Sequence, residues 1–221
     1  NIIISGGGTG GHLFPALAIG DELQIQRPDI SIHYIGSKFG IEKEVLPIKN
    51  VQHSLLPIRG FQRRFNLKSL GKNILLPIRI ISSLSKTRKL FNQIKPQLVI
   101  GTGGYASALP LRESIRRSIP TLIQEQNSFP GITTRWFSKG ANKICIAFEE
   151  SQAMIKNKCI LTGNPIRHDI NTGVRELGLK RYGFEKNKKT LLLFGGSQGS
   201  LALNQMMDKI VTNLSISSTQ V

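Results

Sequence analysis

The chain has 221 residues, of which 30 are Lys or Arg and 13 are Asp or Glu, so its formal net charge is +17. Hydrophobic residues make up 39 % and 22 glycines add to the apolar share, which is typical of a folded domain and argues against disorder. No apolar run approaches the ~20 residues of a membrane-spanning helix, and two cysteines are too few for a disulfide scaffold or a cysteine-built metal site.

The strands and helices expected from the sequence alternate along the chain, which predicts an α/β fold with a parallel sheet. The expected strands are Asn1–Ser5, Ser31–Ile35, Gln52–Leu56, Leu98–Gly101, Thr121–Gln124, Lys143–Ala147, Lys158–Thr162 and Thr190–Phe194. The expected helices are Pro15–Gln26, Lys72–Ile94, Ala106–Arg117, Gly131–Ser138 and Leu201–Val211.

The polar, turn-rich segment Thr162–Lys189 separates two domains in this interpretation. We expect a first domain over residues 1–163, and a linker with the beginning of a second domain over residues 164–221. The chain opens without Met inside an apolar run and stops just after a helical pattern, so we expect a fragment.

Three glycine-rich loops each follow an expected strand and precede an expected helix: Ser5–His12, Gly101–Ser107 and Gly195–Ser200. Glycines let backbone N–H groups approach an anion at the helix N-terminus, so the loops predict a cleft that binds phosphates. A dinucleotide site is disfavoured because the second strand ends in Gly36 and Ser37 without an acidic residue. The alternative is that the glycines only permit tight strand–helix packing.

Five segments, in order and spacing, resemble the MurG family of GT-B glycosyltransferases: Gly6–Ala16, Gly101–Ser107, Glu125–Asn127 with Pro130–Gly131, Gly163–Arg167 and Gly195–Gly199. One departure is Gln124, where the family usually has His. The resemblance implies two Rossmann-like parallel-sheet domains facing a cleft, the second only partly present.

The resemblance also implies a reaction and a place in the cell. The enzyme would move N-acetylglucosamine (GlcNAc) from UDP-GlcNAc to the C4 hydroxyl of lipid I with inversion, forming lipid II in peptidoglycan synthesis, a step needed for cell shape and division. It would act as a peripheral protein on the cytoplasmic side of the bacterial inner membrane, without a cofactor or metal. The fragment alone is expected to be inactive.

Two residues are candidates for catalysis. His12 lies at a helix N-terminus, which favours the neutral imidazole that a general base needs; alternatively it only binds a phosphate or caps its helix. Glu125 is the rival base, or a residue that orients the substrate; alternatively, its carboxylate is a structural acceptor or accepts from a ligand hydroxyl.

The resemblance implies two sets of substrate-binding residues. Those for UDP-GlcNAc are Thr9, Gly10, Gly11, Asn127, Arg167 and Ser197. Those for the acceptor diphosphate are Gly103, Gly104 and Tyr105. Two alternatives stay open: Arg167 forms a surface ion pair beside Asp169, and Tyr105 packs partly into the core.

The charge is concentrated in one stretch, because no Asp or Glu occurs between Val45 and Arg112 while twelve basic residues lie from Lys49 to Arg112. A membrane contact is expected from Arg59, Phe61, Arg63, Arg64, Phe65, Lys68 and Lys72. Cations interleaved with apolar side chains are typical of surfaces that rest on anionic lipid. The alternative is a solvated basic face over an ordinary core.

Two rival functions remain at this point. A basic nucleic-acid-binding module would suit the charge, but no aromatic RNA-binding strand, helix-turn-helix or zinc pattern is recognisable, so no nucleic-acid partner is expected. Another UDP-sugar transferase or an epimerase of the same fold is the second alternative.

Overall fold

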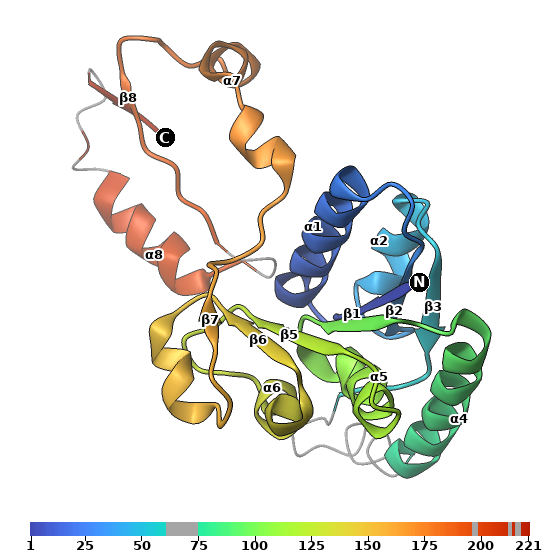
Figure 1. Ribbon diagram of the computed structural model, residues 1–221. Coiled ribbons are helices and arrows are strands. Elements are labelled where there is room, and N and C mark those ends of the chain that lie inside the picture. Colours follow the sequence, from blue (N-terminus) through green and yellow to red (C-terminus); the bar gives the residue numbers. More distant parts are fainter. Residues whose placement is uncertain (61–74, 196–198, 212–213, 215–217) are drawn as a thin grey trace. The chain divides into compact units, whose positions relative to one another are not determined.

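The computed structural model describes residues 1–60, 75–195, 199–211, 214 and 218–221 (Figure 1). It divides into two compact units, Asn1–Arg167 and His168–Val221, called unit 1 and unit 2 below. The sequence-based domain boundary was residue 163, and the compact units divide after Arg167.

Unit 1 contains a seven-stranded, fully parallel sheet in the order β3-β2-β1-β4-β5-β6-β7. The strands are β1 Ile2–Ser5, β2 Ile32–Ser37, β3 His53–Leu56, β4 Leu98–Gly101, β5 Thr121–Glu125, β6 Lys143–Ile146 and β7 Ile160–Leu161. The strand order reverses between β1 and β4, the position at which open α/β sheets bind their ligands.

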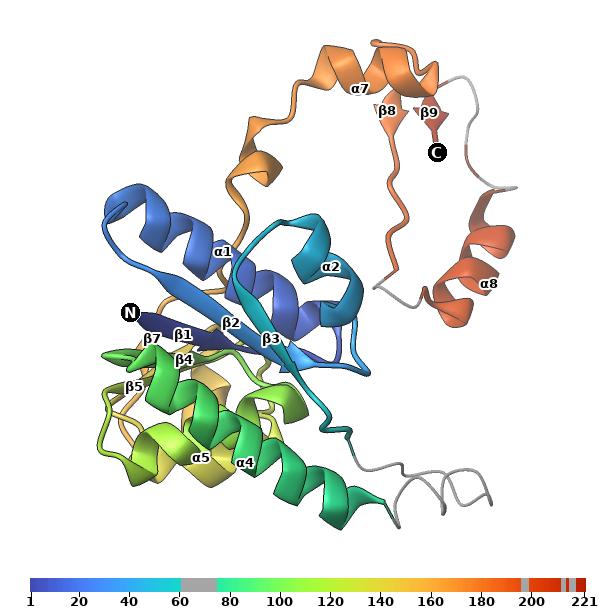
Figure 2. The same cartoon turned by 90° about the vertical axis from the view of Figure 1, so that its right-hand side faces the viewer.

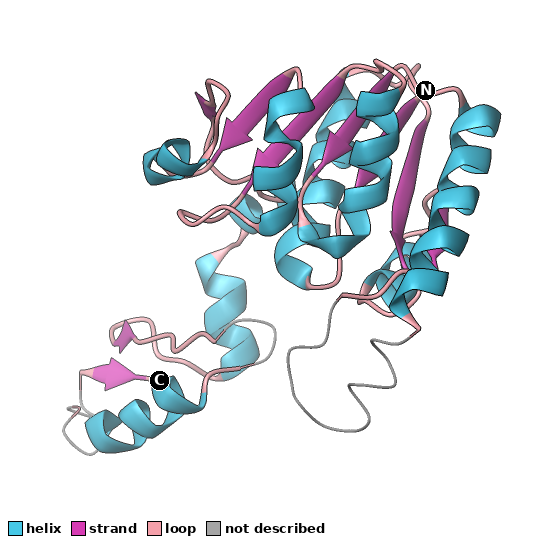
Figure 3. Cartoon of the chain, turned by 90° about the horizontal axis from the view of Figure 1, so that it is seen from below, coloured by secondary structure: helices cyan, strands magenta, loops and turns pink. Residues whose placement is uncertain are grey.

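Helices cover both faces of this sheet (Figures 2 and 3). Helices α1 (Gly10–Gln26) and α2 (Glu42–Ile48) lie on one face. Helices α4 (Leu76–Ile94), α5 (Gly104–Arg116) and α6 (Ile132–Phe137) lie on the other. The α/β fold with a parallel sheet is therefore confirmed.

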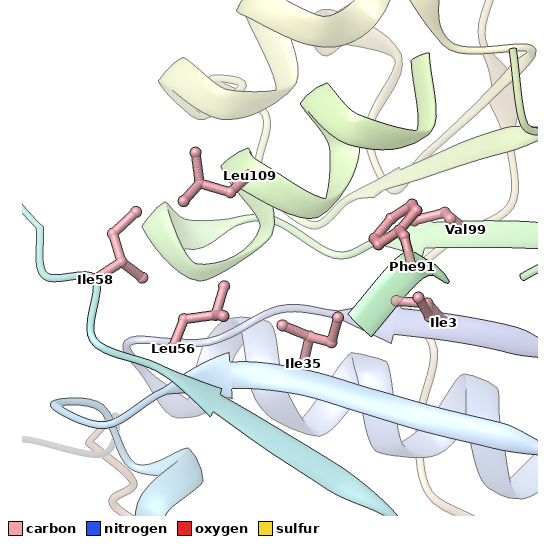
Figure 4. Close-up of a cluster of buried hydrophobic side chains, with 7 residues drawn as sticks. All are labelled: Ile3, Ile35, Leu56, Ile58, Phe91, Val99 and Leu109. Carbon is pink, nitrogen blue, oxygen red and sulfur yellow. The ribbon is translucent and has the colours of Figure 1, made fainter. Parts of the chain in front are cut away.

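The core lies in layers on the two faces, because successive residues of a strand point to opposite sides. Ile3 belongs to a buried cluster with Phe91 of α4 and Leu109 of α5, shown in Figure 4. Its neighbour Ile4 belongs to a second cluster with Leu13 of α1. Burial on both faces explains the uninterrupted isoleucine run of β1.

Two helices begin inside the glycine loops, earlier than the sequence predicts. Helix α1 begins at Gly10 and not at Pro15, and α5 begins at Gly104 and not at Ala106. Glycine has a low helix propensity, so the first turn carries no sequence signal. Helix α2 and helix α7 (Arg175–Tyr182) were not predicted at all.

Unit 2 contains α7, α8 (Leu201–Ile210), and a two-stranded parallel sheet of β8 (Lys189–Thr190) and β9 (Thr219–Gln220). The predicted strand Thr190–Phe194 is wrong beyond Thr190. Leu192 and Phe194 are each 79 % exposed, and no side chain described in unit 2 is buried. An apolar strand requires a covering layer, which the described part of unit 2 does not supply.

Candidate functional site

The candidate site lies where β1, β4 and β5 end, because the carboxyl ends of parallel strands meet at one edge of the sheet. The first glycine loop follows β1, the second follows β4, and residues 126–131 follow β5. Thr102, in the second glycine loop, connects this loop to the first. Its backbone N–H donates to Ser5 O over 2.9 Å, and its hydroxyl donates to His12 O over 2.8 Å.

The two glycine loops approach each other more closely than side chains would allow. A Cβ on Gly104 would lie 2.0 Å from the backbone oxygen of Gly7, and a Cβ on Gly8 would lie 2.6 Å from the ring of Tyr105. Gly104 also has a φ of 74°, which favours glycine. The loops therefore have the packing role that was left open as an alternative, whatever they bind.

His12 lies in the first turn of α1, half-buried between the glycine loops and the segment after β5. Its Nδ1 is 2.8 Å from Gln126 Oε1 and 3.1 Å from Thr102 O. Within the described part of the chain, its Nε2 has no hydrogen-bond partner. The geometry thus leaves one ring nitrogen of His12 for a substrate.

Glu125 is buried, and both of its carboxylate oxygens are occupied. Oε1 accepts from the backbone and side-chain nitrogens of Asn127 over 3.1 and 2.9 Å. Oε2 accepts from Gly131 N over 3.0 Å and from Thr134 Oγ1 over 2.6 Å. These four bonds hold residues 126–131 against α6, so the geometry favours the structural acceptor over a general base.

Four of the residues expected at the donor sugar, Thr9, Gly10, Gly11 and Asn127, lie at two places in unit 1. Thr9 is exposed at the N-cap of α1, where its hydroxyl makes no capping bond and Gly10 and Gly11 form the first helical positions. The first N–H groups of a helix have no partner within it and attract anions. Asn127 lies in the loop that Glu125 holds, and its carbonyl accepts from Ser151 Oγ.

The guanidinium of Arg167 lies 5.4 Å from the ring centre of Phe14. Arg167 therefore contacts α1, the helix that contains His12. The alternative ion pair involves the side chain of Asp169, which is not among those described.

Tyr105 packs partly into the core, which is the alternative that the sequence left open. Its ring packs against the buried cluster that contains Leu109 and lies close to Gly8 and Gly60, and its hydroxyl interacts with the side chain of Ser37. Burial raises the pKa of its hydroxyl above the usual range, so Tyr105 carries its proton at neutral pH and can donate a hydrogen bond.

Several predicted residues lie outside the described part of the chain. They are Ser197 and, from the expected membrane contact, Phe61, Arg63, Arg64, Phe65, Lys68 and Lys72. Of that contact only Arg59 is described, with its guanidinium 4.9 Å from the ring centre of Phe39.

Sequence reasoning did not single out Gln126, although it lies between two residues that were chosen. Its contact with His12 joins residues 114 positions apart, so no local sequence pattern predicts this contact. Among the described residues, no group of three or more His, Cys, Asp or Glu is placed to hold a metal ion. Nor does any described helix combine the length and apolar character needed to cross a membrane.

Comparison with known proteins gives the family. The model of the glycosyltransferase family 28 N-terminal domain matches residues 2–146. A curated relative from Christiangramia forsetii, a UDP-N-acetylglucosamine--N-acetylmuramyl-(pentapeptide) pyrophosphoryl-undecaprenol N-acetylglucosamine transferase, is 43 % identical over 94 % of this chain and 56 % of its own length. The relative of the same name from Bacillus subtilis is 37 % identical over 92 % of this chain and 55 % of its own.

Solved structures show the same fold. The crystal structure of Acinetobacter baumannii MurG matches 97 % of this chain and 57 % of its own, with a TM-score of 0.70 and 24 % identity. A Neisseria meningitidis UDP-GlcNAc 2-epimerase matches with a TM-score of 0.56 at 13 % identity. The Rossmann-like fold and the resemblance to MurG are thus confirmed. The chain spans 56 and 55 % of the two curated relatives and 57 % of the MurG structure. Since the family model covers well over half of its residues, the chain belongs to glycosyltransferase family 28.

Proposed function

We propose that the protein is an inverting glycosyltransferase that moves GlcNAc from UDP-GlcNAc to the C4 hydroxyl of the undecaprenyl-diphosphate-linked acceptor lipid I, forming lipid II in peptidoglycan synthesis. The donor and the acceptor in this proposal are those in the names of the relatives. The observation that carries the chemistry is His12, held at the start of a helix between two glycine loops with one ring nitrogen unoccupied by described residues.

The reaction in this proposal is a single displacement. The C4 oxygen of the acceptor attacks C1 of GlcNAc, the bond from C1 to the UDP oxygen breaks, and UDP leaves with the electron pair. His12 takes the proton of the C4 hydroxyl on its unoccupied nitrogen as general base. Positive potential at the helix N-terminus stabilises the charge that develops on the diphosphate.

The binding residues divide between the two substrates in this proposal. UDP-GlcNAc is bound by Thr9, Gly10, Gly11, Asn127, Arg167 and Ser197. The acceptor diphosphate is bound by Gly103, Gly104 and Tyr105. Support comes from the position of Thr9 at the N-cap of α1, from the cation of Arg167 beside that helix, and from the protonated hydroxyl of Tyr105. Glu125 acts by holding the loop of Asn127.

The proposal includes peripheral binding to the cytoplasmic face of the bacterial inner membrane. A lipid-linked acceptor, as in the names of the relatives, requires the enzyme to reach the bilayer surface. At the start of α4, Leu75, Ile78 and Ile81 are 45, 66 and 68 % exposed. They follow directly on residues 61–74 of the acid-free basic stretch, which supports an apolar and cationic membrane surface.

A transfer assay tests the function. Protein expressed from the complete open reading frame is incubated with UDP-[14C]GlcNAc and a lipid I analogue, with and without the acceptor. We expect labelled disaccharide product only when the acceptor is present. Epimerised UDP-sugar without acceptor, or transfer only to a different acceptor, would contradict the proposal and favour another enzyme of the same fold.

A further inference from the structure

We propose that Gln126 is a positioning residue that holds His12 in the tautomer protonated at Nδ1, so that the lone pair of the neutral ring lies on Nε2. This inference rests on the proposed function only in its consequence for catalysis, because His12 is the proposed base. The tautomer itself follows from the hydrogen bonds around the two side chains.

The orientation of the Gln126 amide is set by three oxygens around its nitrogen. Nε2 donates to Thr102 O over 2.8 Å, to Gln124 O over 3.1 Å, and to Gln124 Oε1. The opposite orientation of the amide would bring Oε1 against these three acceptors, and no donor would remain there. Oε1 therefore faces His12.

The imidazole of His12 has only acceptors around Nδ1. Gln126 Oε1 is 2.8 Å away and Thr102 O is 3.1 Å away, and neither oxygen carries a proton. A lone pair on Nδ1 would repel both oxygens, whereas an N–H at this position bonds to them. In the neutral ring, the other nitrogen then holds the lone pair that accepts a proton.

Gln124 extends this arrangement one residue further from the site. Its amide nitrogen donates to Glu125 O over 3.2 Å, which turns its Oε1 toward the amide of Gln126. Gln124 is buried, so water does not compete for these bonds. Gln124 thus acts on His12 through Gln126, from the position where the family usually has His.

The second glycine loop keeps the ring in place. A Cβ on Gly103 would lie 2.8 Å from His12 Nδ1, and a Cβ on Gly104 would lie 3.0 Å from His12 Cδ2. The absence of side chains at these two glycines lets the imidazole lie directly against the loop. The ring is therefore confined by packing and its proton is placed by Gln126.

Nuclear magnetic resonance tests the tautomer without reference to activity. Protein from the complete open reading frame is labelled with 15N-histidine, and long-range 1H–15N spectra are recorded at a pH where the imidazoles are neutral. Loss of a signal in His12→Ala assigns His12. We expect the Nδ1–H tautomer for His12 in the wild type, and a shift of its population toward Nε2–H in Gln126→Leu.

The controls separate a local effect from a folding effect. His53 Nδ1 lies 2.8 Å from Val51 O, a backbone acceptor that none of the substitutions changes, so its tautomer should stay Nδ1–H in every variant. Gln93→Leu, at an exposed position on α4, should leave His12 unchanged. Gln124→Leu should shift His12 in the same direction as Gln126→Leu but less, because the carbonyl acceptors of Gln126 remain.

Kinetics then connect the tautomer to the reaction. Gln126→Leu should lower kcat by about 10- to 100-fold, a part of the ~10²–10⁴ that a positioned base contributes, with little change in KM for UDP-GlcNAc. The inference is overturned if wild-type His12 is mainly Nε2–H, or if Gln126→Leu leaves its tautomer unchanged because Thr102 O suffices. A Gln126-dependent tautomer in a protein without transferase activity supports the inference and overturns only the proposed function.

Discussion

Glu125 and His12 were both candidate bases, and their hydrogen bonds separate them. The carboxylate of Glu125 accepts four bonds from residues within nine positions of it, which leaves no oxygen for a substrate proton. His12 has one nitrogen bonded and one without a described partner. At the scale of the residue, the proposed base is therefore His12, and the hydrogen bonds of Glu125 hold the loop.

Replacing Glu125 by Gln should destabilise the fold. The amide nitrogen would face the Gly131 N–H or the Asn127 N–H, both of which are donors, so at least one partly buried hydrogen bond to the buried side chain is lost. Such a loss costs ~1–3 kcal/mol. Urea unfolding of Glu125→Gln measures it, with Glu150→Gln at an exposed position as the matched control. A loss in Glu125→Gln no larger than in the control would contradict the loop-holding role.

The residue scale also shows the limit of the sequence. Glu125, Asn127 and His12 were found because they belong to motifs with a recognisable order. The role of Gln126 could not be predicted, because its amide bonds to Thr102 and His12, which follow other strands of the sheet. Chemistry that depends on long-range pairing leaves no local pattern to read.

At the scale of the element, helix α5 ends in a buried carboxylate surrounded by cations. The side chain of Glu113 is 1 % exposed and accepts from Arg116 over 2.6 and 3.0 Å and from Arg117 over 2.7 Å. The hydrogen bond from Arg116 is the main reason that the pKa of the Glu113 carboxyl is held below its usual range. These bonds stabilise the last turn of α5.

The lowered pKa of Glu113 makes stability depend on pH. The unfolded chain takes up this proton near the ordinary value of about 4.3, and the folded chain only at lower pH. The contribution is therefore complete above about pH 4.3 and is lost as the pH falls through the lower folded value.

Glu113→Gln should lower the free energy of unfolding by about 2 kcal/mol at pH 7, as for hydrogen bonds to a charged group, and by less near pH 3. Urea titrations at both pH values measure the difference. Asp29→Asn, in the exposed pair with Arg27, is the control and should show a much smaller trend, because solvent screens this pair. An equal difference at both pH values for Glu113→Gln would refute the assignment.

The elements that could be predicted from the sequence are those whose neighbours lie in the same unit of the chain. The strands of unit 1 alternate with helices that cover them, and their apolar runs are visible in the sequence. The run Leu191–Phe194 has the same character, but among the described residues of unit 2 the one strand beside it is β9, and the strand β8 ends at Thr190. An apolar run indicates a strand only when the fold supplies a layer on each side.

At the scale of the whole molecule, the net charge of +17 has to be assigned to a partner. The site described in unit 1 binds phosphate mainly through backbone N–H groups in the proposal, with Arg167 as a cation. The cations of the acid-free stretch are proposed to bind the anionic membrane surface. The experiment therefore has to test where these cations lie in the chain, separately from the total charge.

Two triple variants separate location from total charge. Arg63, Arg64 and Lys68 changed to Glu, and the exposed Lys156, Lys180 and Lys186 changed to Glu, each lower the net charge from +17 to +11, because three cations become three anions. At low salt, we expect the first variant to lose sedimentation with anionic vesicles and the second to retain most of it. Equal sedimentation of both variants would refute a localised membrane surface.

The rate of sugar transfer in a single turnover tests the central role of His12 most directly. Protein from the complete open reading frame, saturated with UDP-GlcNAc, is mixed with a lipid I analogue, and wild type is compared with His12→Ala. We predict a rate lower by ~10²–10⁴-fold in the variant, with UDP-GlcNAc binding unchanged within a few-fold by calorimetry. A loss of less than about tenfold would contradict the assignment of His12 as the base.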